Sequence, residues 1–284
     1  MNHSKQLWTE EIKSQSSLFS INFSELWHYR DLLLMLLKRD FITFYKQTIL
    51  GPIWFFVQPI MTTVIYVVIF GQVAKLSTDG TPQFAFYLAG ITTWNYFSDS
   101  LVKTSSVFQS NASIFGKVYF PRLTTPISIV ISNLIKFGIQ VILFVCIAIY
   151  QVQFNKAAIN INSTILLLPV LIFLMAIMGL GMGILFSALT TKYRDLSFLL
   201  TFGIQLLMYA TPIIYPLSFT HGKLHILLSY NPITPIIENF RYSFFGIGTF
   251  DAIGLLYSAV FSFIVLFLGI LFFNKVENKF MDTV

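Results

Sequence analysis

Six long apolar segments take up nearly half of this chain and decide what it can fold into. A bilayer core is crossed by about 20 apolar residues in a helix, which is close to the length of each segment. Charged residues make up only 11% of the 284 residues, whereas a soluble domain carries roughly 25%. The sequence therefore predicts an all-α integral membrane protein with six transmembrane helices. The predicted spans are residues 52–74, 84–101, 125–150, 165–189, 196–215 and 252–273.

The basic residues predict how the six spans are oriented. The chain has 18 Lys and Arg and a net charge of +6, and Lys and Arg concentrate in the cytoplasmic connections of membrane proteins. We therefore expect both termini inside, and we interpret the basic character as a topology signal and a contact with anionic membrane lipid, not as nucleic-acid binding. Lys136 falls within the third span. The expected inner residues are Lys5, Lys13, Arg30, Lys38, Arg39, Lys46, Lys103, Lys117, Arg122, Lys192, Arg194, Lys275 and Lys279, and the expected outer residues are Lys75, Lys156, Lys223 and Arg241.

A surface helix precedes the first span. Apolar residues recur at helical spacing over Ser24–Lys46, with charged residues on the other faces, which is typical of an amphipathic helix lying in the membrane interface. Ser24 is the predicted N-cap. Gly51 and Pro52 suit a corner followed by a new helix, and Trp54 suits the headgroup boundary. We therefore divide the chain into a cytoplasmic N-terminal segment, residues 1–50, and a six-span domain, residues 51–284.

The connection 216–251 is unusual for an outer loop because much of it is apolar. Asn231-Pro232 and Pro235 break it into two pieces, each too short to span a bilayer. Irregular backbone at membrane depth is tolerated where it is buried in protein or lines a wet cavity. The sequence therefore predicts two re-entrant half-helices between spans 5 and 6, and Glu238 and Arg241 are spaced to form an ion pair on the second one.

No nucleotide, metal or catalytic site is predicted. A phosphate-binding loop of the form G-x-x-x-x-G-K-[ST] is absent, since Val118 follows Gly116-Lys117 and Leu224 follows Gly222-Lys223. The four histidines form no ligand set, and Cys146 is the single cysteine. Any ATP must therefore be hydrolysed by another chain.

Four motifs follow one another along the chain, together with the surface helix and the six spans. They are Leu50-Gly51-Pro52-Ile53-Trp54 with Pro59, the short inner helix around Phe115-Gly116-Lys117, the turn Tyr193-Arg194-Asp195, and the segment from Asn231-Pro232 to Arg241. This ordered series, which covers nearly the whole chain, resembles the permease subunits of type-2 ABC exporters that move lipid-linked polysaccharide, such as O-antigen, capsule and teichoic-acid polymers.

The resemblance implies a homodimer in the bacterial cytoplasmic (inner) membrane, with the channel at or near the dimer interface. Two copies of a cytoplasmic ABC ATPase would bind ATP and magnesium, so this chain needs no cofactor of its own. The cargo would be an undecaprenyl-diphosphate-linked glycan or a related polymer. The implied ATPase-coupling residues are Asn111, Ile114, Phe115, Gly116, Lys117, Tyr119 and Arg122, with Lys38 and Arg39 on the surface helix. The implied outer-gate residues are Asn231, Pro232, Pro235, Glu238 and Arg241.

Several residues have two open interpretations. Aromatic side chains either contact lipid or line the path and stack on sugar rings. Asp99 pairs either with Lys103 at the membrane boundary or with Lys136. Lys136 either pairs with Asp99, extends to the interface or contacts phosphate. The turn Tyr193-Arg194-Asp195 either caps a helix or contacts a diphosphate or the ATPase. The candidate path residues are Trp54, Phe55, Tyr66, Phe70, Tyr87, Trp94, Tyr96, Lys136, Tyr209 and Tyr215.

Other function classes fit less well. A polyprenyl-phosphate glycosyltransferase would need paired carboxylates for a divalent metal, and the cytoplasmic connections after the first span offer Asp195 alone, with Asp99 just inside the membrane. An ion-coupled flippase would carry more spans and several intramembrane carboxylates. Within the ABC class, a permease for a drug or a small lipid is the alternative.

Overall fold

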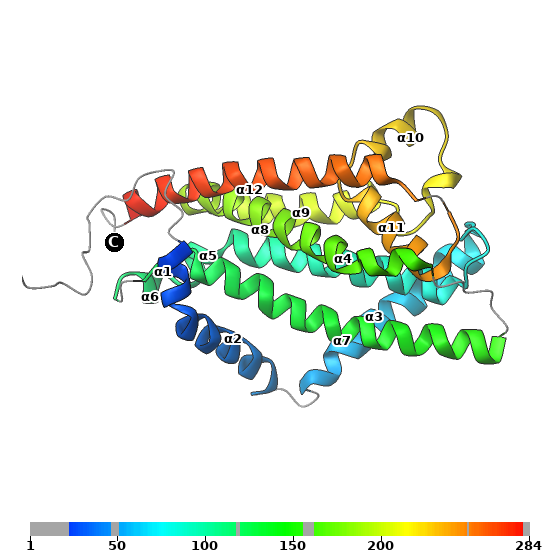
Figure 1. The fold of residues 1–284 in the computed structure, drawn as a ribbon, viewed down its shortest axis with the longest axis horizontal. Helices are drawn as coiled ribbons and strands as arrows, with labels where there is room; N and C mark the ends of the chain where they lie inside the picture. The colour runs from blue at the N-terminus through cyan, green and yellow to red at the C-terminus, as the bar shows by residue number, and fades with distance from the viewer. Residues whose placement is uncertain (1–22, 47–50, 118–119, 156–161, 249, 281–284) are drawn as a thin grey trace, which may run out of the picture.

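The computed structural model describes the chain except for residues 1–22, 47–50, 118–119, 156–161, 249 and 281–284. The described residues form helices and connections, with no strand among them, and the long helices run side by side along one axis (Figure 1). In chain order the elements are α1 (Phe23–His28), α2 (Arg30–Tyr45), η1 (Gly51–Ile53), α3 (Trp54–Tyr66), η2 (Val67–Val73), α4 (Gln83–Ser105), α5 (Val107–Ser110), α6 (Ala112–Phe115), α7 (Thr124–Asn155), η3 (Ser163–Leu167), α8 (Leu168–Lys192), α9 (Leu196–Tyr209), η4 (Leu217–Phe219), α10 (Gly222–Ser229), α11 (Thr234–Phe245) and α12 (Ala252–Phe280).

Among the described residues, four helical stretches are long and apolar enough to cross a membrane. They are Gly51–Val73, Thr124–Gln153, Ser163–Lys192 and Ala252–Val276, and they correspond to the first, third, fourth and sixth predicted spans. Their length and hydropathy confirm an all-α, multi-pass membrane protein.

The other two predicted spans are helical but differ from these four. α4 has 23 residues, most of them buried, and a helix surrounded by other helices can carry polar residues that lipid would not tolerate. α9 has 14 residues, which is about 21 Å of helix, and the chain continues from Ala210 to Pro216 without helical structure. The six-span count therefore stays a prediction, with α4 and α9 as its second and fifth members.

The predicted surface helix is present in two pieces, α1 and α2, which are separated at Tyr29. The prediction that Ser24 is the N-cap is wrong: Ser24 lies inside α1, whereas an N-cap residue has non-helical backbone. α2 buries Leu36 and exposes Leu34 and Met35, so one side of it packs on the protein and its other apolar residues are free for lipid. Gly51 has a φ of 48°, a left-handed conformation that suits the predicted corner.

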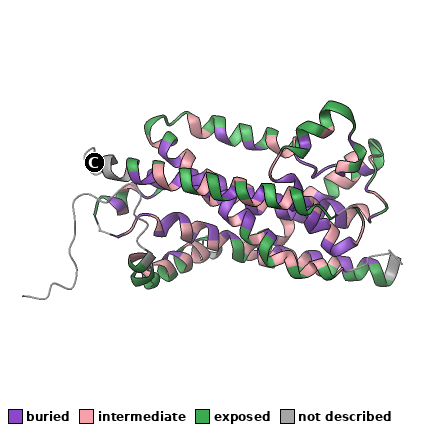
Figure 2. Ribbon diagram, turned by 45° about the horizontal axis from the view of Figure 1, so that its top comes forward, coloured by how far each residue is buried: buried purple, intermediate pink, exposed green. Residues whose placement is uncertain are grey.

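The centre of the bundle is the seam between α8 and its neighbours α4 and α12. A Cβ added at Gly181 would lie 2.7 Å from the Leu266 nitrogen on α12, and one at Gly183 would lie 2.5 Å from the Thr104 Cβ on α4. Glycine at these positions lets helix backbones approach closely, as is common in membrane bundles. Buried residues accordingly concentrate in the inner part of the bundle, and exposed residues follow the outer helices (Figure 2).

The short elements gather at the two ends of the bundle. α1, α5, α6 and the C-terminal part of α12 lie at one end, which we call the α6 end, whereas α10 and α11 lie at the other, the α11 end (Figure 1). The described parts of the predicted inner connections that form α5, α6 and the end of α12 therefore lie at the α6 end, and α10 and α11 of the connection 216–251 lie at the α11 end.

Candidate functional site

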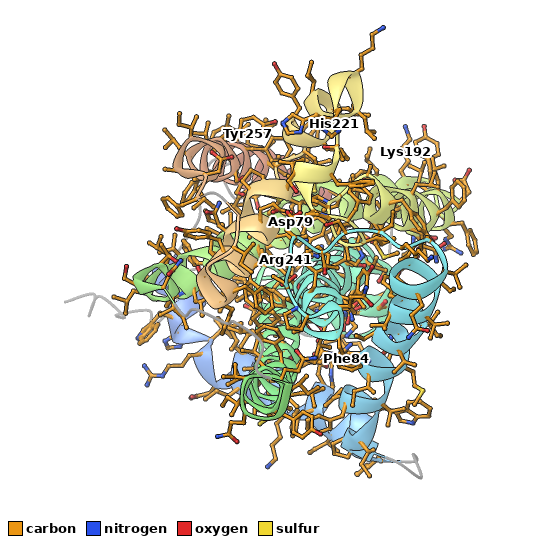
Figure 3. All side chains as sticks on the ribbon, turned by 90° about the vertical axis from the view of Figure 1, so that its right-hand side faces the viewer. Asp79, Phe84, Lys192, His221, Arg241 and Tyr257 are labelled. Atoms are coloured by element: carbon orange, nitrogen blue, oxygen red, sulfur yellow. The ribbon has the colours of Figure 1, made fainter. Side chains whose placement is uncertain are left out.

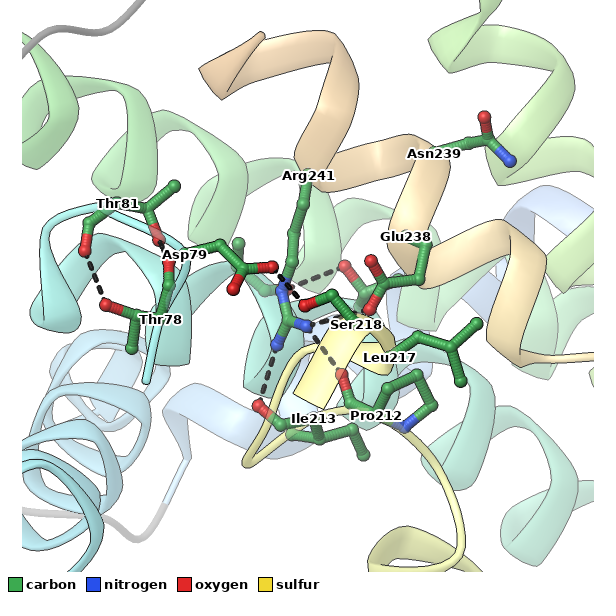
Figure 4. Close-up of polar contacts among 12 residues, drawn as sticks. Thr78, Asp79, Thr81, Pro212, Ile213, Leu217, Ser218, Glu238, Asn239 and Arg241 are labelled. Carbon is green, nitrogen blue, oxygen red and sulfur yellow. Dashed lines mark hydrogen bonds and ion pairs between the residues drawn. The ribbon is translucent and has the colours of Figure 1, made fainter. Parts of the chain in front are cut away.

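Arg241, on α11, is a buried cation that holds the α11 end together. Its side chain is 4% exposed. Nη1 donates to the Pro212 carbonyl at 2.5 Å and Nη2 donates to the Ile213 carbonyl at 2.7 Å (Figure 4). The guanidinium carbon also lies 3.6 Å from the ring centroid of Phe86 on α4, a cation–π contact. One side chain thus joins α11, α4 and the backbone that follows α9.

The backbone after α9 needs these partners because it is irregular. Pro212 has no N–H and disfavours helical backbone at the residue before it, so α9 ends at Tyr209. Arg241 satisfies two of the carbonyls beyond this end, and Asn231 Nδ2 donates to a third, that of Ala210, at 2.9 Å. Side chains from the 231–241 segment therefore replace the helical hydrogen bonds that α9 loses.

The predicted Glu238–Arg241 ion pair is confirmed, with 3.5 Å between Oε1 and Nη1. This is longer than either bond from Arg241 to a carbonyl. Glu238 also accepts a hydrogen bond from the Leu217 N–H. Burial raises the pKa of the Glu238 carboxyl, and the charge of Arg241 opposes that rise. Glu238 is therefore a second partner of Arg241, and the carbonyls are the main ones.

Sequence reasoning did not identify three contributors to this site. Asp79, in the connection before α4, accepts a hydrogen bond from Ser218 at 2.5 Å and lies beside Arg241 near the centre of the end-on view in Figure 3. Gly90 on α4 leaves room for the guanidinium, since a Cβ there would lie 2.5 Å from Arg241 Nη2. Pro212, inside the fifth apolar run, was the one available sequence signal that the helix is interrupted.

The two predicted half-helices differ in burial. In α11 nearly every side chain is buried, and Pro235 lies in its first turn. Asn231 accepts a hydrogen bond from the Ile233 N–H, and the Pro232 carbonyl accepts one from Ser258 on α12 at 2.7 Å. α10 instead stands at the edge of the molecule, where Leu224, Ile226 and Leu227 are more than half exposed (Figure 1). α11 is thus packed inside the protein, as expected for re-entrant backbone, whereas α10 is exposed on this chain.

The predicted coupling residues lie at the α6 end and separate into two groups. Asn111, Phe115 and Arg122 are buried, and the Phe115 ring contacts Phe108 at 5.8 Å and the Arg122 guanidinium at 5.5 Å. Ile114 is half-buried, and Gly116 and Lys117 are exposed. Phe115 therefore anchors the short helix α6, and Gly116 and Lys117 follow its end as exposed residues. Tyr119 lies outside the described residues.

Two other predicted contact regions are exposed. Lys38 and Arg39 are exposed on α2, and Arg39 pairs with Asp40 at 2.8 Å. Tyr193, Arg194 and Asp195, between α8 and α9, are all exposed. The Asp195 side chain makes no capping hydrogen bond to α9, so the turn is not explained as a side-chain helix cap.

The candidate path aromatics do not share one surface. Tyr66 contacts Phe70 and Tyr87 edge-on, with centroids 5.3 and 6.1 Å apart, so these three form one group between α3, η2 and α4. Trp54 and Tyr209 are about half exposed. The remaining candidates are half-buried Tyr215 and buried Phe55, Trp94 and Tyr96.

Lys136, on α7, pairs with Asp99, on α4, with 2.6 Å between Nζ and Oδ2. Of the open interpretations of Lys136, pairing with Asp99 is therefore the one observed. Lys103 donates to Asn133 Oδ1 at 2.9 Å, so α4 and α7 are joined by a polar seam within otherwise apolar helices.

The family model and the individual proteins to which this chain is similar all describe membrane transporters. Residues 31–245 match the family model described as ABC-2 type transporter. The chain is 29% identical over 255 residues to the O-antigen export system permease protein RfbA of Klebsiella pneumoniae, covering 89% of this chain and 94% of that protein. It is 26% identical over 262 residues to the RfbA of Myxococcus xanthus, with 92% and 98% covered. The polysialic acid transport protein KpsM of Escherichia coli is 21% identical over 253 residues, with 87% and 94% covered.

Proposed function

The chain belongs to the ABC-2 type transporter membrane family, and from this premise we propose that it is the permease subunit of an ATP-driven exporter of lipid-linked polysaccharide. The observation that carries the proposal is the full-length similarity to permeases named for O-antigen export and to one named for polysialic acid transport. The cargo is an O-antigen, capsule or teichoic-acid type polymer on a diphosphate-linked lipid carrier, and the membrane is the bacterial inner membrane.

A separate ABC ATPase supplies the energy in this proposal. The chain has no phosphate-binding loop, and it presents Lys117 and the Tyr193-Arg194-Asp195 turn as exposed groups. We assign the α6 end to the cytoplasm, where two ATPase copies dock on a dimer of this chain. The positive charges of the predicted inner connections support this orientation.

The α11 end is then the outer side, and α11 with the backbone it holds after α9 forms the gate. A gate must be stable when closed and able to change between two discrete arrangements. Arg241 supports the closed arrangement because a single side chain contacts α4, α9's end and Glu238.

The proposal is tested by removing the gene from its own bacterium and labelling cell-surface polysaccharide. We expect the polymer to disappear from the surface and to accumulate on its lipid carrier inside the cell, with export restored by the full-length gene. A permease for a drug or a small lipid would leave the surface polymer unchanged. Purified protein alone should show no ATPase activity, and robust hydrolysis by the isolated chain would contradict the proposal.

A further inference from the structure

Arg241 has one hydrogen-bond donor that its present partners leave unused. Its Nη1 and Nη2 groups donate to the Pro212 and Ile213 carbonyls (Figure 4), whereas Nε has no hydrogen-bond partner among the described residues. The side chain is almost fully buried, so bulk water does not supply an acceptor. A buried N–H without an acceptor costs free energy, and such a group in a folded protein calls for a physical explanation.

The hydroxyl of Tyr87, on α4, is a second buried group without a partner. Tyr87 is 0% exposed, and its hydroxyl makes no hydrogen bond within the described part of the chain. Its ring is held by edge-on contacts with Tyr66 and Phe86, at centroid distances of 6.1 and 5.5 Å. A tyrosine hydroxyl can accept a hydrogen bond as well as donate one, so Tyr87 has the acceptor that Nε of Arg241 lacks.

The guanidinium of Arg241 lies on α4 beside Tyr87. Its central carbon is 3.6 Å from the ring centroid of Phe86, the residue before Tyr87. A Cβ added at Gly90 would lie 2.5 Å from Nη2, and Gly90 is one helical turn beyond Phe86 and Tyr87, on the strip of helix surface between them. Tyr87 and Arg241 are also within electrostatic range of each other. Two unpaired buried groups are therefore neighbours that are not bonded to each other.

Opening of the proposed gate requires Arg241 to change partners. When the backbone after α9 moves away from α11, the guanidinium loses both carbonyls, and a buried cation without acceptors is strongly unfavourable. Glu238 lies on α11 with Arg241 and is already 3.5 Å from Nη1, so it supplies no new contact. Asp79 already accepts a hydrogen bond from Ser218. The hydroxyl of Tyr87 is the neighbouring acceptor without a partner in the described residues.

We propose that Tyr87 is the positioning residue that receives Arg241 when the gate opens, by accepting a hydrogen bond from Nε. α11 then stays on α4, and the gate separates between α11 and the backbone that carries Pro212 and Ile213. The two unpaired groups raise the free energy of the closed arrangement, and their bond lowers that of the open one, so the two arrangements become closer in free energy. This inference rests on the proposed function, because it gives the gate its second arrangement.

The test compares two variants that each delete one buried hydroxyl from α4. Tyr87→Phe removes the proposed acceptor. Thr92→Val is the matched control, because the Thr92 hydroxyl is also buried and has no hydrogen-bond partner among the described residues. Both variants lose an unsatisfied polar group and keep nearly the same shape, so neither should lower the thermal unfolding midpoint.

Gate opening is measured with Ile213→Cys in a Cys146→Ser chain, assembled with its ATPase in lipid nanodiscs that contain no polymer. Ile213 is 0% exposed and lies against Gly90, so a charged maleimide should label the new cysteine faster when ATP opens the gate. In the Tyr87→Phe chain this ATP-dependent labelling should fall roughly tenfold, the size expected for losing a hydrogen bond to a charged group. Thr92→Val should leave it unchanged.

Reduced labelling in Tyr87→Phe alone, with an unfolding midpoint that is not lowered, supports the proposal, because a residue with a purely structural role would lose stability. A lowered midpoint would show that the hydroxyl already has a partner in the closed arrangement, such as a buried water, and would overturn the proposal. Equal ATP-dependent labelling of the Tyr87→Phe and Thr92→Val chains would also overturn it, since no polymer is present for Tyr87 to contact.

Failure of the proposed function gives a different result from failure of the Tyr87 contact. If the Ile213→Cys chain that retains Tyr87 shows no ATP-dependent labelling, the gate assignment is wrong, and the inference falls with it. If that chain responds to ATP and the Tyr87→Phe chain responds equally, the gate stands and only the contact between Tyr87 and Arg241 is wrong.

Discussion

Arg241 donates to two backbone carbonyls at shorter distances than to Glu238. Loss of the carbonyl contacts should therefore destabilise the protein more than loss of the ion pair. Arg241→Met leaves the Pro212 and Ile213 carbonyls without their side-chain donor and Glu238 without its cation, which should cost about 2–5 kcal/mol of folding free energy. Arg241→Lys keeps the charge but not the planar fork that reaches both carbonyls, so it should rescue only part of the loss. Glu238→Gln should be the mildest. The measurement is the thermal unfolding midpoint in detergent, together with surface polymer.

Equal midpoints for Arg241→Lys and the unchanged protein would show that charge alone matters at this position. If Glu238→Gln were as damaging as Arg241→Met, the ion pair and not the carbonyl contacts would hold the α11 end.

Gly90 gives a second residue-level prediction. Gly90→Ala places a methyl group 2.5 Å from Arg241 Nη2 and 3.2 Å from Ile213, so the guanidinium must shift. Such overpacking typically costs about 1–3 kcal/mol. Matched controls are Gly138→Ala on α7 and Gly203→Ala on α9, where the added Cβ meets no atom within 4 Å. A lowered unfolding midpoint for Gly90→Ala alone supports the account, and an unchanged one contradicts it.

At the residue scale, the sequence predicts contacts that are local along a helix. The Glu238–Arg241 pair follows from its i, i+3 spacing. The partners Pro212 and Ile213 do not, because they are backbone carbonyls in a distant segment and carry no side-chain signal. Asp99 illustrates the same limit: Lys103 is near in sequence, whereas Lys136 is brought close only by the packing of α4 on α7.

Among the elements, α10 and α11 should differ in their access to water. Single cysteines are introduced in a Cys146→Ser background and exposed to a membrane-impermeant thiol reagent on intact cells. Leu224→Cys and Leu227→Cys on α10 are at exposed positions and should react, whereas Ile236→Cys and Ile237→Cys on α11 are buried and should not. Uniform labelling of all four positions would mean that the segment is an ordinary solvated loop, and the gate assignment would then be wrong.

α6 gives a prediction for coupling. Lys117→Ala removes an exposed charge and should leave the fold intact while lowering ATPase-driven export. Phe115→Ala should lower export and should also destabilise the fold. The expected loss is about 3–5 kcal/mol of folding free energy, because the variant empties the cluster that anchors the short helix. Lys223→Ala, an exposed charge on α10 at the other end, is the control. Normal export by Lys117→Ala would move the coupling surface to Lys38 and Arg39.

At this scale the apolar runs predict most of the helices, because burial in lipid demands long apolar stretches. They do not predict where a helix stops inside such a run. α9 ends at Tyr209 although the run continues to residue 215, and Val67–Val73 is a π-helix within the first span. The end of α9 depends on how side chains from other segments satisfy the backbone, and hydropathy contains no information about that.

For the whole molecule, the central feature is the separation of its two ends. The α6 end carries the exposed Lys117 and the Tyr193-Arg194-Asp195 turn, and the α11 end carries the buried Arg241 contacts (Figure 1). A subunit that receives energy on one side of a membrane and opens on the other needs this separation. The class of protein and a polysaccharide as its cargo could be predicted from the order of sequence features. Which polymer it moves could not, because aromatic residues serve lipid contact and sugar stacking equally well.

The most direct test of this account is transport in inside-out membrane vesicles that contain this chain and its ATPase, with lipid-linked polysaccharide labelled on the outer, cytoplasmic face. We expect the polymer to become protected from an added glycosidase only when ATP is present. Protection should be lost when the ATPase is omitted and reduced when Lys117→Ala replaces the unchanged chain. Polymer that stays fully digestible with ATP, ATPase and the unchanged chain all present would contradict the assignment of this protein as a polysaccharide-export permease.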